Sequence, residues 1–280
     1  MASPGEAADG KAPLRILAST FPIYLFTQNV CAGAQDVRTE LLIPAAVGCP
    51  HDFALKPADL QKLAKADVLV INGHDLEDFL EKMLQTPPPG LKVITAGEGI
   101  AALPAAVSSH GHEHGNPHIF AAPEEAARMV LNIASALSDI DPVNAAIYKE
   151  NAQKFSKQAD ELSSRLKALG QKAANKNVVI SHDGLAYLMH NANLEVAAIL
   201  ENSDSLAKLT ALKREFKNNR PAVIAGDAQY PDKLAMALAR ETDIPFARLD
   251  ICASGPQNPS LNFYQEVMEN NLKILEKYFE

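Results

Sequence analysis

The stretch Leu41-Leu42-Ile43-Pro44-Ala45-Ala46-Val47-Gly48-Cys49-Pro50-His51-Asp52-Phe53 joins an apolar run to a histidine. The run at its start predicts a buried strand, and His51 follows on the loop past the carboxyl end of that strand. In open α/β sheets the ligand-binding crevice lies at this edge, because the loops that leave the strands converge there. His51 is therefore placed like a ligand-binding residue.

Three further strand-like segments end close to a side chain that can bind a metal ion. They cover residues 116–120, 178–183 and 245–250 and carry His118, His182 and Asp250. Three imidazole rings and one carboxylate suit a four-coordinate zinc ion. Imidazole suits zinc, copper and nickel, whereas manganese favours oxygen donors, so a histidine at position 182 favours zinc. We expect each ligand histidine to donate its second ring N–H to a carboxylate or a carbonyl.

Strand-like and helix-like segments alternate along the chain, which is the pattern of parallel sheets flanked by helices. Strands are predicted over residues 14–20, 37–43, 67–73, 91–95, 178–181, 195–200, 222–226 and 246–249. Between the two halves, residues 141–169 carry apolar side chains at helical spacing and predict one helix roughly 40 Å long. The expected fold is α/β, with two lobes joined by this backbone helix. The expected boundaries are an N-terminal metal-binding lobe over 13–140, a linking helix over 141–172 and a C-terminal metal-binding lobe over 173–280.

Composition narrows the class of protein. The 280 residues allow one large domain or two of ordinary size, and the formal net charge is −8. This charge argues against a nucleic-acid partner, since a nucleic-acid surface usually gathers Lys and Arg. No apolar run approaches the roughly 20 residues that a helix needs to cross a bilayer, so we expect a soluble protein.

The start of the chain and its cysteines bear on the compartment. Residues 1–11 lack the basic start and the apolar run of a signal peptide, which at face value indicates the cytoplasm. The same small, polar leader also resembles the start of a processed, exported protein. Cys31, Cys49 and Cys252 permit one disulfide with one thiol left over, which fits either compartment.

The segment Ser108–Gly115 has alternating histidines, two glycines and no apolar residue. It cannot pack into a core, so we expect a mobile loop. Its three histidines, His110, His112 and His114, could form an auxiliary site that collects zinc weakly. The alternative is a linker that is merely solvated.

Several short motifs occur in an order and at intervals that are specific in combination. They are Pro50-His51-Asp52-Phe53, Lys56-Pro57-Ala58-Asp59, Asn72-Gly73, Asn116-Pro117-His118, His182-Asp183-Gly184-Leu185-Ala186-Tyr187 and Leu249-Asp250. In this respect the chain resembles the zinc/manganese solute-binding proteins of bacterial ABC importers, the zinc-uptake type built on a long backbone helix. The resemblance covers nearly the whole chain from Leu14 onward.

The resemblance implies a site and a task. It implies that His51 and His118 from the N-terminal lobe and His182 and Asp250 from the C-terminal lobe bind the metal. It implies a non-enzymatic, monomeric receptor that captures a divalent metal, Zn(II) rather than Mn(II), and delivers it to the membrane permease of an ABC transporter. It also favours export to the periplasm or another extracytoplasmic location, with the signal peptide absent from this sequence.

Other interpretations stay open. The chain could be a manganese-selective member of the same class, an adhesin on the same scaffold, or a zinc hydrolase in which Asp250 acts as base beside an open coordination site. Asp227 is a rival to Asp250 as the carboxylate ligand. Cys49 and Cys252 could pair as a disulfide across the cleft, or one of them could compete as a thiolate ligand.

Overall fold

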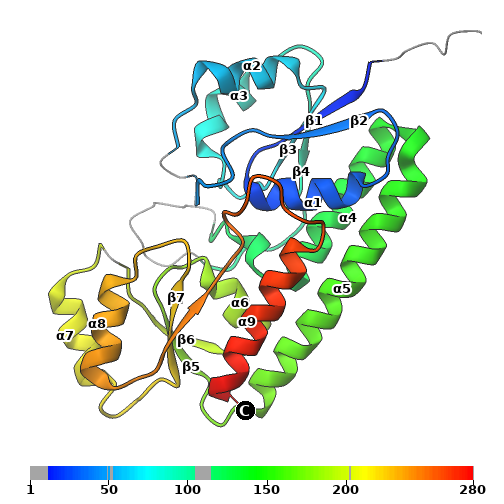
Figure 1. Cartoon of the computed structure of the whole chain (residues 1–280). Coiled ribbons are helices and arrows are strands. Elements are labelled where there is room, and N and C mark those ends of the chain that lie inside the picture. The colour runs from blue at the N-terminus through cyan, green and yellow to red at the C-terminus, as the bar shows by residue number, and fades with distance from the viewer. Residues whose placement is uncertain (1–11, 49, 51–52, 105–114, 202, 280) are drawn as a thin grey trace, which may run out of the picture.

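The computed structural model describes residues 12–48, 50, 53–104, 115–201 and 203–279, and its frame consists of two parallel four-stranded sheets (Figure 1). The first sheet has the strand order β2-β1-β3-β4. Its strands are β1 (Leu14–Ala18), β2 (Val37–Leu41), β3 (Val68–Ile71) and β4 (Lys92–Thr95). The second sheet repeats this arrangement with the order β6-β5-β7-β8. Its strands are β5 (Asn177–Ile180), β6 (Glu195–Ile199), β7 (Val223–Asp227) and β8 (Phe246–Leu249).

Helices cover both faces of the two sheets. The α-helices are α1 (Phe21–Cys31), α2 (Pro57–Lys65), α3 (Glu81–Gln85), α4 (Pro123–Ile140), α5 (Ala145–Lys172), α6 (Leu185–Asn191), α7 (Leu206–Glu215), α8 (Lys233–Thr242) and α9 (Phe263–Phe279). Among the described residues, short 3-10 helices lie at Asp78–Leu80, Ile119–Ala121 and Pro142–Asn144. A proline stands in the first turn of α1, α2 and α4, where its missing N–H would have had no helical partner. The predicted α/β class is thus confirmed.

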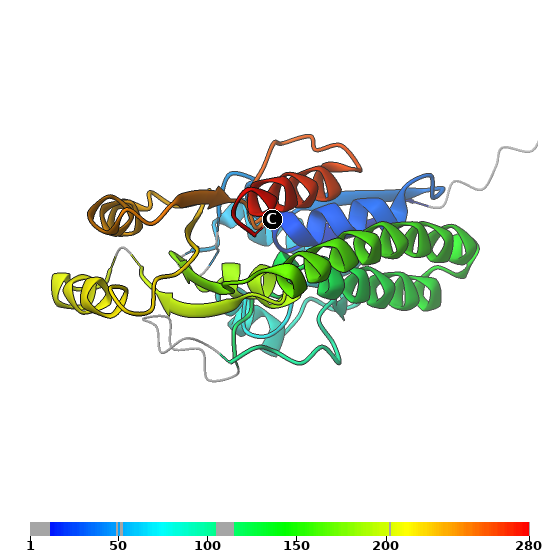
Figure 2. The ribbon, with the colours of Figure 1, turned by 90° about the horizontal axis from the view of Figure 1, so that it is seen from below.

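The long helix α5 is the element that ties the two halves together. It has 28 residues and therefore a length of about 42 Å. It begins at Ala145 because Pro142–Asn144 forms a 3-10 turn before it. It lies along α4 and packs against α1 and α9 (Figures 1 and 2). Near its end, a Cβ on Gly170 would come within 1.9 Å of the Ala192 carbonyl oxygen, so only glycine permits this close approach to the turn after α6.

One apolar core extends from the first sheet to the second. It includes Ile16 and Val68 from the first sheet, Phe155 from α5, and Val178 and Val223 from the second sheet. The opposite faces of the sheets have smaller cores under α2 and α3 and under α7 and α8. Because both of its faces are covered, the inner strand β3 is a continuous buried apolar run, whereas the edge strand β2 carries Arg38 and Glu40.

The strand order places a crevice in each half. In the second sheet, the connections leave β5 and β7 in opposite directions, so the loops after these two strands diverge. The loop after β5 starts with Ser181 and His182, and β7 ends at Asp227. The sheet therefore brings His182 and Asp227 to the same edge.

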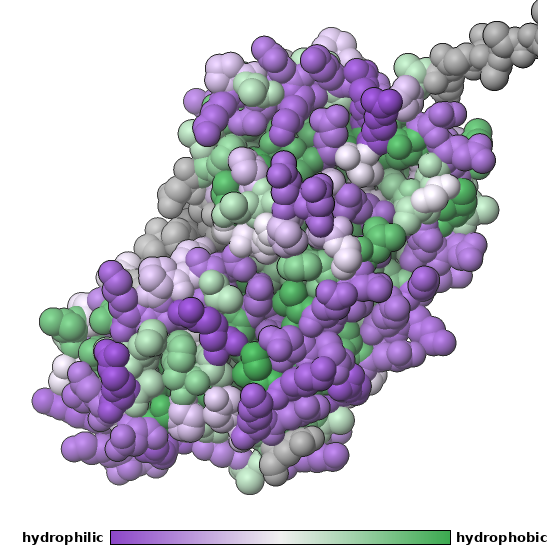
Figure 3. All heavy atoms as spheres, in the orientation of Figure 1, coloured by the Kyte–Doolittle hydropathy of each residue, from purple (hydrophilic) through white to green (hydrophobic). Residues whose placement is uncertain are grey.

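The outer surface of the molecule is largely polar. On the face seen in Figure 3, hydrophilic side chains predominate, and hydrophobic ones are scattered among them. Within the part of the chain that the structure describes, no helix has both the length and the apolar composition to cross a membrane.

Candidate metal centre

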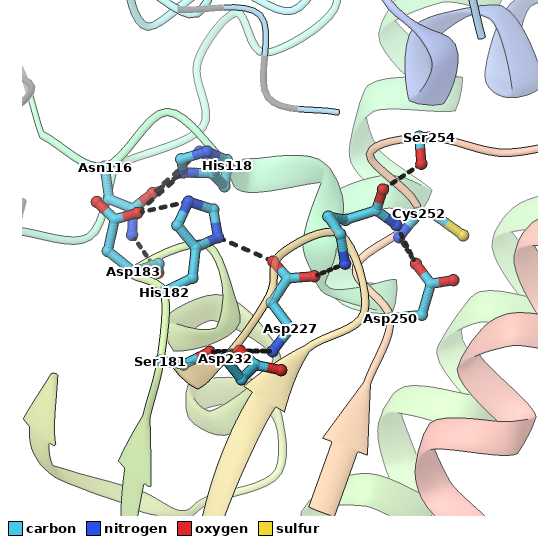
Figure 4. Close-up of polar contacts among 11 residues, drawn as sticks. Asn116, His118, Ser181, His182, Asp183, Asp227, Asp232, Asp250, Cys252 and Ser254 are labelled. Atoms are coloured by element: carbon cyan, nitrogen blue, oxygen red, sulfur yellow. Dashed lines mark hydrogen bonds and ion pairs between the residues drawn. The ribbon is translucent and has the colours of Figure 1, made fainter. Parts of the chain in front are cut away.

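Two of the predicted ligands, His118 and His182, lie next to each other between the two halves of the molecule (Figure 4). Their ring centroids are 4.9 Å apart. Their residues are 1% and 6% exposed, so both are buried. His182 follows β5 as predicted. The segment that holds His118 is not the predicted strand, because Asn116–His118 has no strand pairing and leads directly into the 3-10 turn Ile119–Ala121.

Each of these histidines has a partner for its second ring nitrogen. His118 Nδ1 lies 2.8 Å from Asn116 Oδ1, and His182 Nδ1 lies 2.9 Å from Asp227 Oδ2. Both partner atoms only accept hydrogen bonds, so the ring proton of each neutral histidine sits on Nδ1. The lone pair is then on Nε2, which is the form that binds a metal ion. Both partners are of the expected kind, a side-chain carbonyl and a carboxylate, and Asp227, the rival to Asp250 as carboxylate ligand, is the partner of His182.

Asn116 connects the two halves at this point. Its Nδ2 donates to the Asp183 carbonyl oxygen at 2.8 Å, which turns its Oδ1 toward His118. The Tyr187 hydroxyl from α6 donates to the Asn116 carbonyl oxygen at 2.8 Å and accepts from the Leu103 backbone N–H at 2.9 Å. The ring of His118 is therefore fixed through Asn116 to the second half of the molecule.

A carboxylate that sequence reasoning did not select lies beside the two rings. Asp183 Oδ1 is 3.4 Å from His182 Nε2 and 3.7 Å from His118 Nδ1. The three side chains are buried and each offers a ligand atom within 4.8 Å of the others, a spacing that an ion could bridge. Little in the sequence indicated Asp183, since adjacent side chains usually point in different directions. Here the turn after β5 makes the side chains of His182 and Asp183 converge.

Asp250 lies outside this group of three. Its Oδ1 accepts hydrogen bonds from Gln229 Nε2 at 3.0 Å and from the Cys252 backbone N–H at 2.7 Å. Gln229 in turn donates its backbone N–H to Asp227 Oδ1 at 3.0 Å, so Asp250 is linked to His182 through two intermediate residues (Figure 4). Burial raises the pKa of Asp250, and the two hydrogen bonds act against this rise.

Several predicted features fall outside the described residues. These are His51, Cys49 and the histidines His110, His112 and His114. The described part of the loop before His51 does reach the second half. The Gly255 backbone N–H donates to the Ala45 carbonyl oxygen at 2.9 Å, and a Cβ on Gly48 would lie 3.8 Å from the Gln229 side chain.

The charges around His182 favour a cation. Burial by itself lowers the pKa of His182, but the hydrogen bond and charge of Asp227 and the charges of Asp183 and Glu201 outweigh it. The net effect is a raised pKa. The same carboxylates that hold a proton on His182 would attract a divalent ion, so protons and metal compete at this ring.

Two lobes of the same α/β topology, a long helix beside both and a buried imidazole pair between them define a two-lobed binding protein. The family described as zinc-uptake complex component A, periplasmic (ZnuA), matches residues 16–278. The chain belongs to this family.

Individual relatives agree with this assignment. The high-affinity zinc uptake system protein ZnuA of Bacillus subtilis is 26% identical over 96% of this chain and 89% of its own length. The zinc-binding lipoprotein AdcA of Streptococcus pneumoniae is 28% identical over 97% of this chain, which spans only 56% of AdcA. Among solved structures, the SBP FpvC of Pseudomonas aeruginosa in complex with Mn²⁺ has a TM-score of 0.83 and 27% identity, covering 95% of this chain and 98% of FpvC. The same protein has also been solved with Ni²⁺.

Replacing Asn116 with alanine is expected to weaken zinc binding by about 10–100-fold, because His118 loses the acceptor that orients its ring. A competition titration with a chromophoric zinc chelator measures this. Asn132→Ala is the matched control, since Asn132 Nδ2 also donates to two backbone carbonyls, those of Ala96 and Glu98. Unchanged affinity in Asn116→Ala would show that this amide does not position His118.

Proposed function

We propose that this protein captures a divalent transition metal, Zn(II) in preference to Mn(II), between its two lobes and delivers it to the membrane permease of an ABC importer. The observation that carries the proposal is the buried pair His118 and His182, whose Nδ1 atoms face hydrogen-bond acceptors on Asn116 and Asp227. Membership of a zinc-uptake family and the zinc proteins among its relatives support the same task.

The proposed ligands are His51, His118, His182 and Asp250. The Gly255 backbone N–H donates to the Ala45 carbonyl oxygen and Gly48 approaches Gln229, so the described part of the loop that leads to His51 reaches the second half. Asp250 is connected to His182 by hydrogen bonds through Gln229 and Asp227, which supports a place for its carboxylate in the same network.

The donor set supports zinc and a task without catalysis. Imidazole nitrogen suits zinc better than manganese, which favours oxygen. Four protein ligands leave no open position for an activated water, so we propose capture and release and no hydrolysis. FpvC has been solved with Mn²⁺ and with Ni²⁺, so a direct comparison of zinc with manganese tests this preference.

The proposed setting is extracytoplasmic. The family is described as periplasmic and AdcA as a lipoprotein, which supports a receptor that works outside the cytoplasm, next to its permease. We propose that it acts as a monomer. We further propose that the N-terminal lobe covers residues 13–140, the C-terminal lobe residues 173–280, and the linking helix residues 141–172.

Titration of the metal-free protein with zinc and with manganese tests this function. We expect one ion per chain by elemental analysis, with zinc bound more tightly than manganese, and a lower zinc affinity in both His51→Ala and Asp250→Asn. The matched controls are His190→Ala and Asp243→Asn. His190 is exposed at the end of α6, and Asp243 has a left-handed backbone conformation that asparagine also adopts readily. Tighter binding of manganese, or zinc affinity in His51→Ala and Asp250→Asn equal to that of the controls, would contradict the proposal.

A further inference from the structure

The carboxylate of Asp183 is buried, and none of the residues that the structure describes donates a hydrogen bond to it. The residue is 1% exposed. A buried ionised carboxylate is costly unless hydrogen bonds or a cation compensate it. Other buried aspartates of this chain do have donors. Asp59, for example, accepts from the Lys56 backbone N–H at 2.9 Å.

The surroundings of Asp183 point to a cation as the missing partner. Because Asp227 holds the proton of His182 on Nδ1, the neutral ring presents the lone pair of Nε2 toward Asp183 Oδ1 at 3.4 Å. Two electron-pair donors then face each other in a buried site, which is unfavourable in the absence of an ion. Figure 4 shows the Asp183 carboxylate beside the rings of both His118 and His182.

The separation of these atoms fits a shared metal ion. Zinc binds imidazole nitrogen and carboxylate oxygen at about 2.0–2.2 Å, so two such atoms on a tetrahedral ion lie about 3.4 Å apart. The distance between His182 Nε2 and Asp183 Oδ1 has this value. Gly184 allows this arrangement, because a Cβ there would come within 2.9 Å of the His182 ring.

We propose that Asp183 is itself a metal ligand and binds the captured ion through a carboxylate oxygen next to His118 and His182. The inference rests on the proposed function, since it concerns the same ion. Together with Asp250 it would offer the ion two carboxylates from the second lobe, so the carboxylate part of the ligand set would come from protein and not from water. His182 and Asp183, adjacent on one turn, would then be a pair of ligands already at the right separation before the ion binds.

Asp183→Asn tests this inference, because the amide keeps the shape of the side chain but loses the charge and most of the metal affinity. Loss of an orienting partner outside the ligand shell weakens binding by about 10–100-fold, so loss of a ligand should weaken zinc binding by about 100-fold or more. The metal-free variant should unfold at a temperature no lower than that of the parent, since a buried charge without a donor is removed. Asp183→Ser, which also lacks the carboxylate, should show the same two effects.

Asp59→Asn is the matched control and should behave in the opposite way. Asp59 is a buried carboxylate with a hydrogen-bond donor, so its variant should lose thermal stability and keep its zinc affinity. A zinc affinity within about threefold of the parent in Asp183→Asn, while His118→Ala loses binding, would overturn the role of Asp183 alone. A loss of affinity accompanied by a lower unfolding temperature of the metal-free protein would assign Asp183 a structural role and also overturn it. Unchanged binding in His118→Ala would instead overturn the proposed function.

Discussion

Alanine at both His118 and His182 is expected to abolish zinc binding, and either substitution alone is expected to weaken it by orders of magnitude. Structural zinc sites with four ligands bind with about 10–16 kcal/mol, so one ligand contributes about 3 kcal/mol on average. This corresponds to a roughly 100- to 1,000-fold loss of affinity for each histidine. The measurement is a competition titration at pH 7.5, with the thermal unfolding of each metal-free variant recorded in parallel.

Two other histidines of the chain serve as controls for this prediction. His190 is exposed at the end of α6, and His74 Nε2 lies 3.2 Å from the Gly97 carbonyl oxygen. Neither is a proposed ligand, so His190→Ala and His74→Ala should bind zinc as the parent does. If the variants at His118 and His182 also bound zinc normally while folded, the ion would have to lie elsewhere in the molecule.

The fold could be predicted from the sequence because its elements are strongly patterned. Strands covered on both faces, such as β3, are short apolar runs bounded by polar turns, and α4 starts at a proline in its first turn. The long helix was predicted from apolar spacing, but its first residue was not, because Pro142 suits a 3-10 turn as well as the first turn of an α-helix. The short helix α3 was missed because it contributes no buried residue.

The candidate site was only partly predictable, for reasons of geometry. A histidine after a strand can be placed at the edge of a sheet, and this is how His182 was selected. His118 was selected with a wrong local structure, since its segment is a turn. The partners Asn116 and Asp227 could not be assigned, because hydrogen bonds between distant segments depend on how the lobes pack. Asp183 was not selected because convergence of adjacent side chains depends on the detailed turn after β5.

Zinc affinity is expected to fall steeply as the pH is lowered from 7.5 to 5.0, because protons compete with the ion for imidazole nitrogen. For one histidine with the ordinary pKa near 6.5, this competition alone lowers the affinity roughly 30-fold over that range. The raised pKa of His182 enlarges the effect and moves its onset to a higher pH. Zinc titrations at several pH values measure it, and equal affinities at pH 7.5 and 5.0 would contradict imidazole ligation.

Zinc affinity rises with pH, whereas the contribution of His182 to the stability of the metal-free protein falls as the pH rises. Since the pKa of His182 is higher in the folded state than in the unfolded state, its contribution to stability is complete below the unfolded pKa. That contribution is lost as the pH rises through the folded pKa. Zinc stabilises the folded protein more as the pH rises, because the ligand nitrogens are then unprotonated. The difference in unfolding temperature between zinc-loaded and metal-free protein should therefore widen from pH 5.5 to 7.5. Asp227→Asn removes the hydrogen-bonded charge that raises the pKa of His182, so in this variant the same widening should begin at a lower pH. A curve that coincides with that of the parent would show that Asp227 does not control the protonation of His182.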